Sequence, residues 1–353
     1  MPGKIRLALA GVGNCASALL QGLAWYAQGD SEVGLTQRVL GGYDVCDITP
    51  VLAFDVSAHK VGRDLAEAIM APPNCAWQVP EVCVGMTGVE VLPGPVADGM
   101  PPHLEKYAPL SDAAPVDLVQ ALRDSGAEVL LNMLPTGSAK ASRLYAQAAL
   151  EAGVAFVNGM PELIVCDESF AGEALERGVP VVGDDVKSQL GGTILHRAMV
   201  EAMQARGIHI RRTYQLNYAG NTDFDNLVNR GESKEQTKRE AVETLIPYET
   251  GVSAGFAHVP VMGDRKTTRF YFDVVNFSGA PLHIDATLEV EDSANFGGTV
   301  VDAIRCCRVA LDRGVGGVLQ SASALYCKHP PQPLTDAAAL QQVAEFLQGE
   351  RER

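Results

Sequence analysis

A glycine-rich turn close to the N-terminus constrains the fold more than any other feature of this sequence. The apolar run of residues 5–10 gives way at once to Gly11-Val12-Gly13-Asn14-Cys15-Ala16, and apolar residues then recur at helical spacing through Leu23. This order predicts a buried strand, a tight turn and a helix. In a G-x-G-x-x-A pattern of this kind, the first glycine permits the turn and the second lets a pyrophosphate approach the backbone.

The turn indicates a dinucleotide-binding site. The N-terminus of the following helix favours phosphate charge, and the alanine lets the helix pack closely on the strand. We therefore predict that Gly11, Gly13, Asn14, Cys15 and Ala16 bind the cofactor. The alternative is a tight turn in an α/β domain that binds no nucleotide.

An acidic residue should end the second strand and hold the adenosine ribose, and Asp55 closes the next clearly apolar run. It lies 55 − 11 = 44 residues beyond Gly11, against a usual spacing of about 20. An insertion around residues 29–47 would account for the excess. Asp44 and Asp47 compete for the role, although both sit among turn residues. A carboxylate here repels a 2′-phosphate, so NAD is favoured over NADP.

Short apolar runs alternate with helical stretches through the first half of the chain, as in a parallel α/β domain. Strand after strand ends in Gly, Asn, Asp, Ser or Pro, and ligands bind at the carboxyl ends of such strands. A long proline-rich loop is expected over 93–115, and a helix over 138–153 follows Pro135-Thr136-Gly137. The expected strands cover residues 5–10, 51–56, 84–91, 128–133, 155–158 and 180–182.

The second half of the chain has a different hydrophobic pattern, because its longer apolar runs show period-2 alternation in places. We expect strands over 212–217, 268–275 and 283–290 in an antiparallel or mixed sheet, one helix over 233–245, and helix again from 298. The predicted fold class is therefore α/β, with a Rossmann-type NAD-binding domain and a central α+β domain.

Composition narrows the partners and the compartment. With 47% hydrophobic and 20% charged residues, 353 residues suit two globular domains, and no apolar run approaches the roughly 20 residues of a membrane-spanning helix. The short run after Lys4 and Arg6 ends too early for a signal peptide. A formal net charge of −15 argues against nucleic acid and anionic membranes. Eight cysteines without a C-x-x-C pair are typical of reduced thiols in a cytoplasmic protein.

Two lysines stand where stability alone would not place them. Ser233 and Gln236 form a capping box, so Lys234 and Lys238 fall in the first turns of a helix, four residues apart. Like charges at that spacing repel, and cations there oppose the helix dipole. Either an anionic ligand offsets this cost, or the lysines lie on a solvated helix face.

Three polar strings are further candidates for the same site. They are the stretch Asn217 to Asp223, the triplet Asp264-Arg265-Lys266 and the triplet Glu291-Asp292-Ser293. Each adjoins an expected strand, and each taken singly could be an ordinary turn.

These strings together resemble the inositol-3-phosphate synthase family, also called the myo-inositol-1-phosphate synthase family. The matching segments occur in family order over nearly the whole chain: GVGNCAS, AFDV, NMLPTGS, GDDVKSQLGGT, LNYAGNTDFDNL, SKEQTK, DRK, EDS and LYCKHPP. The resemblance implies conversion of D-glucose 6-phosphate to 1D-myo-inositol 3-phosphate with catalytic NAD. Hydride leaves C5, a proton leaves C6, the enolate closes on the C1 aldehyde, and the hydride returns.

The resemblance also implies roles for particular residues. Lys234 and Lys328 would serve the O5 end, and Lys238 and Lys266 the phosphate or O1, because ammonium groups stabilise developing oxyanions. The family positions that line the substrate or cofactor site match Asp185, Asn217, Asn221, Asp223, Asp264 and Asp292. Cofactor-side contacts would include Pro135, Thr136, Gly137, Asp185, Ser188, Asp292 and Ser293.

The family's domain plan gives an NAD-binding domain over 1–195 and 298–353, and a catalytic and tetramerisation domain over 196–297. Family members are usually homotetramers, and they use a divalent or a monovalent cation. Residues 254–263 and 45–49 depart from the family pattern, which bears on substrate preference. Three alternatives stay open: a related cyclase of another sugar phosphate, an ordinary NAD-dependent dehydrogenase, and a non-catalytic dinucleotide sensor.

Overall fold

The computed structural model describes residues 3–230, 239, 242, 243 and 245–353. They form two compact units, one of Met1–Lys187 with Phe296–Arg353 and the other of Ser188–Asn295. The sequence placed these divisions at 195/196 and 297/298. The assignment of NAD binding to the first unit and of catalysis and tetramerisation to the second stays a prediction.

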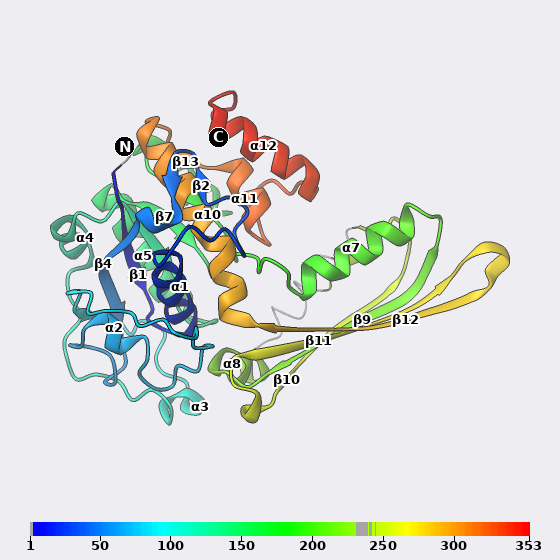
Figure 1. Cartoon of the computed structure of the whole chain (residues 1–353), viewed down its shortest axis with the longest axis horizontal. Coiled ribbons are helices and arrows are strands. Elements are labelled where there is room, and N and C mark those ends of the chain that lie inside the picture. Colours follow the sequence, from blue (N-terminus) through cyan, green and yellow to red (C-terminus); the bar gives the residue numbers. More distant parts are fainter. Residues whose placement is uncertain (1–2, 231–238, 240–241, 244) are drawn as a thin grey trace. The chain divides into compact units, whose positions relative to one another are not determined.

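A seven-stranded parallel sheet forms the centre of the first unit (Figure 1). The first strand, β1, neighbours β4 on one side and β6 on the other, so the strand order reverses at β1. Six of the seven strands follow the order of a Rossmann fold. From one edge to the other the strands are β13 (Gly317–Val318), β8 (Pro180–Val182), β7 (Ala155–Asn158), β6 (Val129–Asn132), β1 (Ile5–Ala10), β4 (Ile48–Asp55) and β5 (Val91–Pro93).

Helices cover both faces of this sheet, because successive side chains of a strand point to opposite sides. Leu7 and Leu9 of β1 join one buried cluster and Ala8 and Ala10 the other. The first cluster packs under α1 (Asn14–Tyr26), α10 (Asp292–Asp312, within this unit from Phe296), α11 (Gln320–Tyr326) and α12 (Asp336–Gln348). The second packs under α4 (Leu118–Ser125), α5 (Ala139–Ala152) and α6 (Glu168–Glu176).

An inserted hairpin separates α1 from β4 and explains the long spacing to Asp55. It consists of β2 (Val39–Leu40), β3 (Tyr43–Asp44) and the short 3-10 helix η1 (Val45–Asp47). The fully buried Arg305 of α10 donates hydrogen bonds to the carbonyl oxygens of Gln37, Arg38 and Tyr43. These bonds anchor the insertion against the helix layer.

Two expectations for the first half were wrong in detail. The strand expected over 84–91 is reduced to β5, and the preceding α2 (Leu65–Ala68) is one turn of helix. Gly85 and Gly88 interrupt the apolar pattern there, and glycine weakens a strand. The proline-rich loop contains a short helix, α3 (Pro102–Glu105).

A mixed four-stranded sheet forms the second unit, as expected. Strand β10 pairs parallel with β9, whereas β11 pairs antiparallel with both β9 and β12. In sheet order the strands are β10 (Gly251–His258), β9 (His209–Ala219), β11 (Arg265–Val275) and β12 (Pro281–Glu291). The short 3-10 helices η2 (Pro260–Met262) and η3 (Phe277–Gly279) precede β11 and β12.

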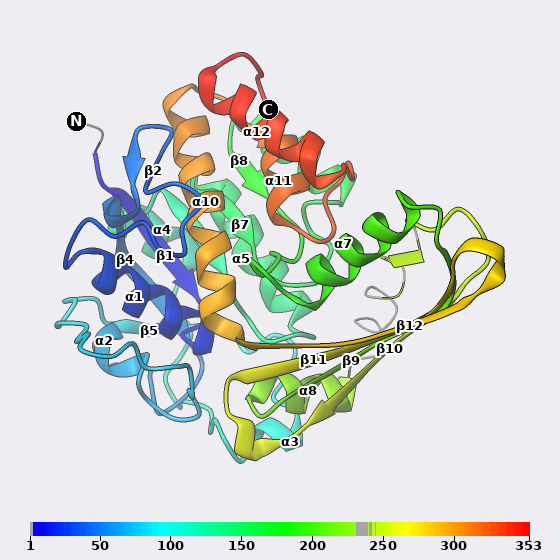
Figure 2. The ribbon, with the colours of Figure 1, turned by 45° about the vertical axis from the view of Figure 1, so that its right-hand side comes forward.

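One face of this sheet is covered by α7 (Gly192–Gln204), which runs along the long strands in Figure 2. Its Val200 and Met203 pack on Phe270 and Phe272 of β11. His196, also on α7, shares a hydrogen bond of 2.8 Å between its Nε2 and the hydroxyl of Thr213. The helix α8 (Thr222–Arg230) contacts β10, where Phe224 meets Phe256.

The sequence did not predict β10, α7 or α8. Strand β10 reads Gly-Val-Ser-Ala-Gly-Phe-Ala-His, which has low strand propensity, so its pairing with β9 decides its structure. Of the helix expected over 233–245, Ser233, Lys234, Gln236 and Lys238 lie outside the described residues.

Candidate functional site

The glycine turn after β1 has the shape that a pyrophosphate requires. Gly11 has φ +95°, and a Cβ there would lie 2.8 Å from the carbonyl oxygen of Met133, so only glycine fits. At Gly13, by contrast, a Cβ would meet no atom within 4 Å. Gly13 is also the N-cap of α1, and no side chain caps that helix. The N-terminus of α1 therefore offers its amides and dipole beside open space, which fits a dinucleotide phosphate.

Asp55 ends β4 beside this turn and is held there by backbone amides. Its carboxylate accepts hydrogen bonds from the N–H groups of Val12 at 2.9 Å, Val56 at 2.8 Å and Ser57 at 2.9 Å. The competing carboxylates are engaged elsewhere, because Asp44 and Asp47 form a capping box at η1. Of the three candidates, Asp55 therefore stays the predicted acidic residue for the ribose hydroxyls.

The remaining residues of the glycine motif support the turn. The side-chain oxygen of Asn14 accepts hydrogen bonds from the backbone N–H groups of Cys75 at 2.7 Å and Ala76 at 3.1 Å. Ala16 is fully buried in the layer between α1 and the sheet, as its place in the motif predicts, and Cys15 is half-buried. The Asn14 side chain therefore fixes the neighbouring loop.

The loop after β6 approaches the glycine turn across the switch point. The N–H of Met133 donates to the carbonyl oxygen of Ala10 at 2.8 Å, which joins the ends of β6 and β1. The loop continues through Pro135, the buried Thr136 and Gly137, whose N–H donates to Glu162 at 3.1 Å. This is the edge where a Rossmann fold binds its ligand.

A buried polar network follows the carboxyl ends of the next strands. Asn132 donates to Asn158 at 2.9 Å, and Asn158 donates to Asp184 at 2.7 Å. Asp184 also accepts the backbone N–H groups of residues 164–166, each at 3.0 Å. Burial raises the pKa of Asp184, although these hydrogen bonds favour its ionised form.

The network ends beside an ion pair between Asp185 and Lys328. Their backbones pair, since the N–H of Lys328 donates to the Asp185 carbonyl at 2.7 Å, and the Lys328 ammonium donates to the Asp185 carboxylate at 2.6 Å. Asp185 has φ +61°, a conformation that residues other than glycine rarely adopt. Such strained residues cluster at functional sites. Two segments far apart in sequence thus supply one charged pair.

In the second unit, Asp264 forms hydrogen bonds with residues of the other two predicted polar strings. It accepts hydrogen bonds from the Asn221 side chain at 2.9 Å and from both the N–H and the hydroxyl of Ser293 at 3.0 Å. Burial raises the pKa of Asp264, and the nearby charge of Asp292 raises it further. Asp264 therefore joins the turn after β9 to the start of α10.

Lys266 and Asp292 form an ion pair next to this centre. Lys266 is in β11 two residues after Asp264, and Asp292 begins α10 directly before Ser293, so the same two backbone segments place both the ion pair and the Asp264 hydrogen bonds. An anchored ammonium group of this kind can stabilise an oxyanion or a phosphate.

Asn217 is fully buried in β9 and faces the first turn of α7. Its side-chain oxygen accepts hydrogen bonds from Thr268 at 3.0 Å and Gln215 at 3.3 Å. A Cβ on Gly192 would lie 2.0 Å from the Gln215 amide nitrogen and 2.9 Å from the methyl carbon of Thr268, so a larger residue there would force these side chains to shift. Two further predicted residues, Asp223 in α8 and Ser188 at the start of the unit, are half-buried.

The structure thus groups the described site residues within each unit, whereas Lys234 and Lys238 lie outside the described residues. Among the residues with described positions, no group of three or more His, Cys, Asp or Glu side chains could hold a metal ion. None of the described helices is long and apolar enough to cross a membrane.

Comparison with known proteins identifies the family. The sequence model of a family described as myo-inositol-1-phosphate synthase matches residues 191–293. An inositol-3-phosphate synthase of Corynebacterium glutamicum is 44% identical over 97% of this chain and 98% of its own length. One from Mycobacterium tuberculosis strain H37Rv is 42% identical over 98% of this chain and 96% of its own length. The chain belongs to the inositol-3-phosphate synthase family.

Solved structures share the fold of this chain. The crystal structure of Ari2 matches with a TM-score of 0.81 at 35% identity and covers 98% of this chain and 99% of its own. The inositol-3-phosphate synthase of Caenorhabditis elegans matches with a TM-score of 0.77 at 19% identity, over 98% of this chain and 86% of its own, and shows the shared fold alone. The resemblance and the α/β fold class are confirmed.

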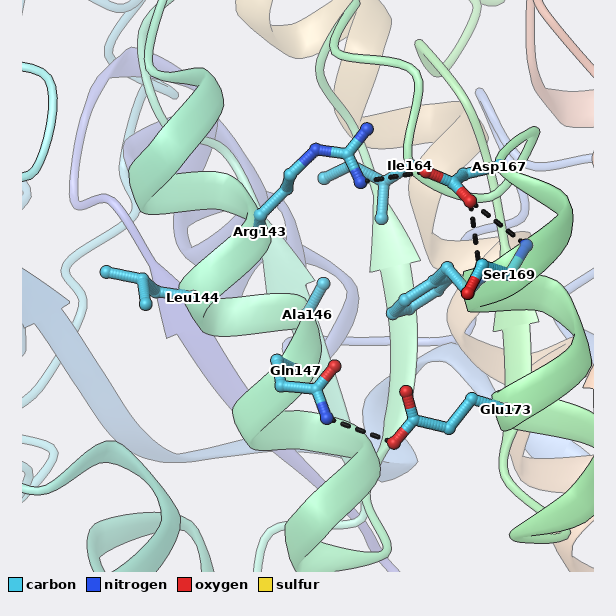
Figure 3. Close-up of a pocket in the computed structure, with 9 residues that line it drawn as sticks. Arg143, Leu144, Ala146, Gln147, Ile164, Asp167, Ser169 and Glu173 are labelled. Atoms are coloured by element: carbon cyan, nitrogen blue, oxygen red, sulfur yellow. Dashed lines mark hydrogen bonds and ion pairs between the residues drawn. The ribbon is translucent and has the colours of Figure 1, made fainter.

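A groove of 280 Å³ lies between α5 and α6 and contains none of the predicted family site residues (Figure 3). Ion pairing of Arg143 with Asp167 at 3.1 Å and a hydrogen bond from Gln147 to Glu173 at 3.0 Å bridge the two helices across it. Its contacts are those of ordinary helix packing on the outer side of the sheet.

Sequence reasoning missed four buried polar residues: Lys60, Asn132, Asn158 and Asp184. Three of them end or follow apolar strands, and that position was the available signal for a residue near the ligand edge. Lys60 has no such signal, because it lies in a turn beyond β4 and reaches the glycine motif only in the folded chain.

Proposed function

We propose that this member of the synthase family converts D-glucose 6-phosphate to 1D-myo-inositol 3-phosphate with NAD as a catalytic cofactor. The observation that carries the proposal is the match to inositol-3-phosphate synthases over nearly the whole chain. The charged pairs built by the two units supply ammonium groups for such a reaction. The enzyme would be an intramolecular lyase, an isomerase that consumes no cofactor overall.

The first unit supports NAD binding through its glycine turn. The α1 N-terminus and the space beside Gly13 suit the pyrophosphate, and the Asp55 carboxylate suits the adenosine ribose and repels a 2′-phosphate. When bound, NAD would supply the acceptor and later the donor of the hydride at C5. A divalent or monovalent cation, which family members use, belongs to the proposal as well.

Lys328 is assigned, with Lys234, to the oxygen on C5. An ammonium has three hydrogens, and the pair with Asp185 uses one of them at 2.6 Å. The Asp185 carboxylate thereby orients the ammonium toward a developing negative charge without consuming its donor capacity. Preorganised cations of this kind lower the energy of an oxyanion most strongly where water is excluded.

Lys266 is assigned, with Lys238, to the phosphate or to the oxygen on C1. Asp292 orients the Lys266 ammonium, while Asp264 acts indirectly, because its oxygens are already taken by Asn221 and Ser293. Crowded lysines also lose a proton more readily, so the Lys234 and Lys238 pair is suited to shuttle the C6 proton.

We propose a homotetramer that uses the face of the second sheet opposite α7. On this face Tyr214 and Tyr271 stack at 5.5 Å, and Tyr271 and His283 at 5.9 Å. Arg269 pairs with Asp285 at 2.6 Å beside them. Aromatic side chains and arginine are enriched at protein interfaces. Light scattering at micromolar concentration tests this state, and a monomer would overturn it.

The cytoplasm is the proposed compartment, since eight scattered cysteines without a C-x-x-C pair are typical of reduced thiols. The proposed small-molecule partner is a sugar phosphate, and nucleic acid and membranes are not expected as partners at a net charge of −15.

A carbon NMR time course with glucose 6-phosphate and a trace of NAD tests the activity. Formation of an inositol phosphate without net NADH supports the proposal. Stoichiometric NADH, read from the absorbance of the reduced nicotinamide, would replace it with an ordinary dehydrogenase. No conversion despite tight NAD binding would replace glucose 6-phosphate with another sugar phosphate, to be found in a substrate panel.

A further inference from the structure

The buried side chain of Lys60 contacts the backbone of the glycine turn. Lys60 lies in the turn that follows β4, and only 4% of its surface is exposed. Its ammonium donates to the carbonyl oxygen of Val12 at 2.8 Å and to the side-chain oxygen of Asn74 at 2.9 Å. The same ammonium lies 3.9 Å from the carboxylate of Asp55.

Packing alone does not account for a charge in this position. Burial lowers the pKa of Lys60, and only the nearby Asp55 acts in the opposite direction. Replacing a buried ion pair with apolar residues of similar volume is often neutral or stabilising. A lysine at this place is therefore better explained by what it does to the groups that it contacts.

Both polar groups of the Val12 backbone form hydrogen bonds within the protein. Its N–H donates to Asp55 at 2.9 Å, and its carbonyl oxygen accepts from Lys60 and also from Asn74 at 3.0 Å. In a planar trans peptide the carbonyl and the following N–H point in opposite directions. Because the Val12 carbonyl points at Lys60, the N–H of Gly13 points away from it.

The charge of Lys60 also bears on the dinucleotide. Asp55 brings a negative charge to the turn that would receive a pyrophosphate, and an ammonium at 3.9 Å offsets part of that charge. The two short hydrogen bonds direct this ammonium toward Val12 and Asn74. It is therefore not directed toward a 2′-phosphate, as the arginine of an NADP-binding site would be.

We propose that Lys60 is a positioning residue for NAD: it orients the Val12–Gly13 peptide so that the Gly13 N–H faces the pyrophosphate, and it compensates Asp55 without admitting NADP. The proposal rests on the proposed use of NAD. It assigns to Lys60 no contact with the cofactor.

Calorimetric titration of the full-length apo protein with NAD and NADP tests this role. We expect Lys60→Met to raise the Kd for NAD about 10- to 50-fold, with no gain in affinity for NADP, because one buried charge and one peptide constraint are lost together. Lys60→Arg, which restores the charge, should recover part of the affinity. Lys4→Met is the matched control, since Lys4 pairs with Asp47 at 3.2 Å and precedes the opposite end of β1.

A second measurement separates positioning from simple loss of structure. Amide hydrogen exchange of the peptide spanning residues 11–17 should quicken in Lys60→Met, while peptides from β6 and β7 keep wild-type protection. Asn74→Ala loosens the same carbonyl without removing a charge, and it should raise the Kd for NAD by a smaller factor. This variant keeps the idea testable if Lys60→Met does not fold.

The outcomes are distinct. Wild-type protein that binds no NAD overturns the proposed cofactor and this inference with it. Wild-type protein that binds NAD, with folded Lys60 and Asn74 variants that bind it equally well, overturns the inference alone. Tighter NADP binding by Lys60→Met would overturn the claim about cofactor choice.

Discussion

Replacing each glycine of the turn by alanine should separate folding from cofactor binding. At Gly11 the backbone has φ +95°, which costs a residue with a Cβ about 1–2 kcal/mol. The new Cβ would also lie 2.8 Å from the Met133 carbonyl oxygen, and overpacking of this kind costs roughly 1–3 kcal/mol. Lower entropy of the unfolded chain returns about 0.4–1 kcal/mol. We therefore expect Gly11→Ala to lower the free energy of unfolding by about 2–4 kcal/mol.

Gly13→Ala should behave in the opposite way. Its φ of −89° and ψ of −159° are accessible to alanine, and no atom lies within 4 Å of the new Cβ. Because alanine is a poorer N-cap than glycine, the free energy of unfolding should fall by no more than about 1 kcal/mol. The methyl group would occupy the space proposed for the pyrophosphate, so the Kd for NAD should rise by roughly 30-fold or more, equal to about 2 kcal/mol.

Urea unfolding followed by circular dichroism measures the first quantity, and calorimetric titration with NAD measures the second. Unfolding must be measured without NAD, because a bound ligand stabilises the native state by mass action. A Gly13→Ala protein that binds NAD like the wild type would refute the placement of the pyrophosphate. Equal destabilisation by both variants would refute the distinction between a packed and an open glycine.

Three further predictions concern the charged residues. Lys328→Met should lower the free energy of unfolding by about 2–4 kcal/mol, because it removes one partner of an ion pair whose carboxylate, on Asp185, is only 4% exposed. Adding Asp185→Asn should recover much of the loss in urea unfolding, and no recovery would contradict a coupled pair. Burial and Asp292 raise the pKa of Asp264 above its unfolded value, so the native state favours the protonated form. The stability of the wild type relative to Asp264→Asn should then fall as pH rises from about 4 through the raised pKa and level off above it, and a rise would contradict this sign. Lys234→Ala should abolish formation of inositol phosphate while the Kd for NAD is unchanged, and full activity would remove the role assigned to it.

Local pattern was sufficient for several elements in the first half of the fold. Strand β1, the turn at Gly11 and the helices α1 and α5 follow from apolar periodicity and glycine chemistry, which act over a few neighbouring residues. The same signal failed at β10, because a sequence of glycine, alanine and serine becomes a strand only by pairing with β9.

The candidate site residues also fall into those that the sequence predicted and those that only the fold brought together. The end of an apolar strand was enough to name Asp55 as a candidate, because the polar residue after a buried parallel strand lies at the ligand edge of the sheet. Asp264 was named from a polar string before an expected strand, and the family resemblance named Asp185. Their partners come from distant segments: Lys328 meets Asp185 through backbone pairing, and Ser293 reaches Asp264 from the start of α10.

By itself, then, the sequence determined the α/β class, the dinucleotide turn and the residue types of the family's chemistry. Only the tertiary structure decided which carboxylate binds which lysine, because an ion pair depends on a distance in space that sequence spacing does not encode. Lys60 shows the difference most clearly. Nothing near it in the sequence marks it, and its effect on the turn arises from burial against Val12, Asn74 and Asp55.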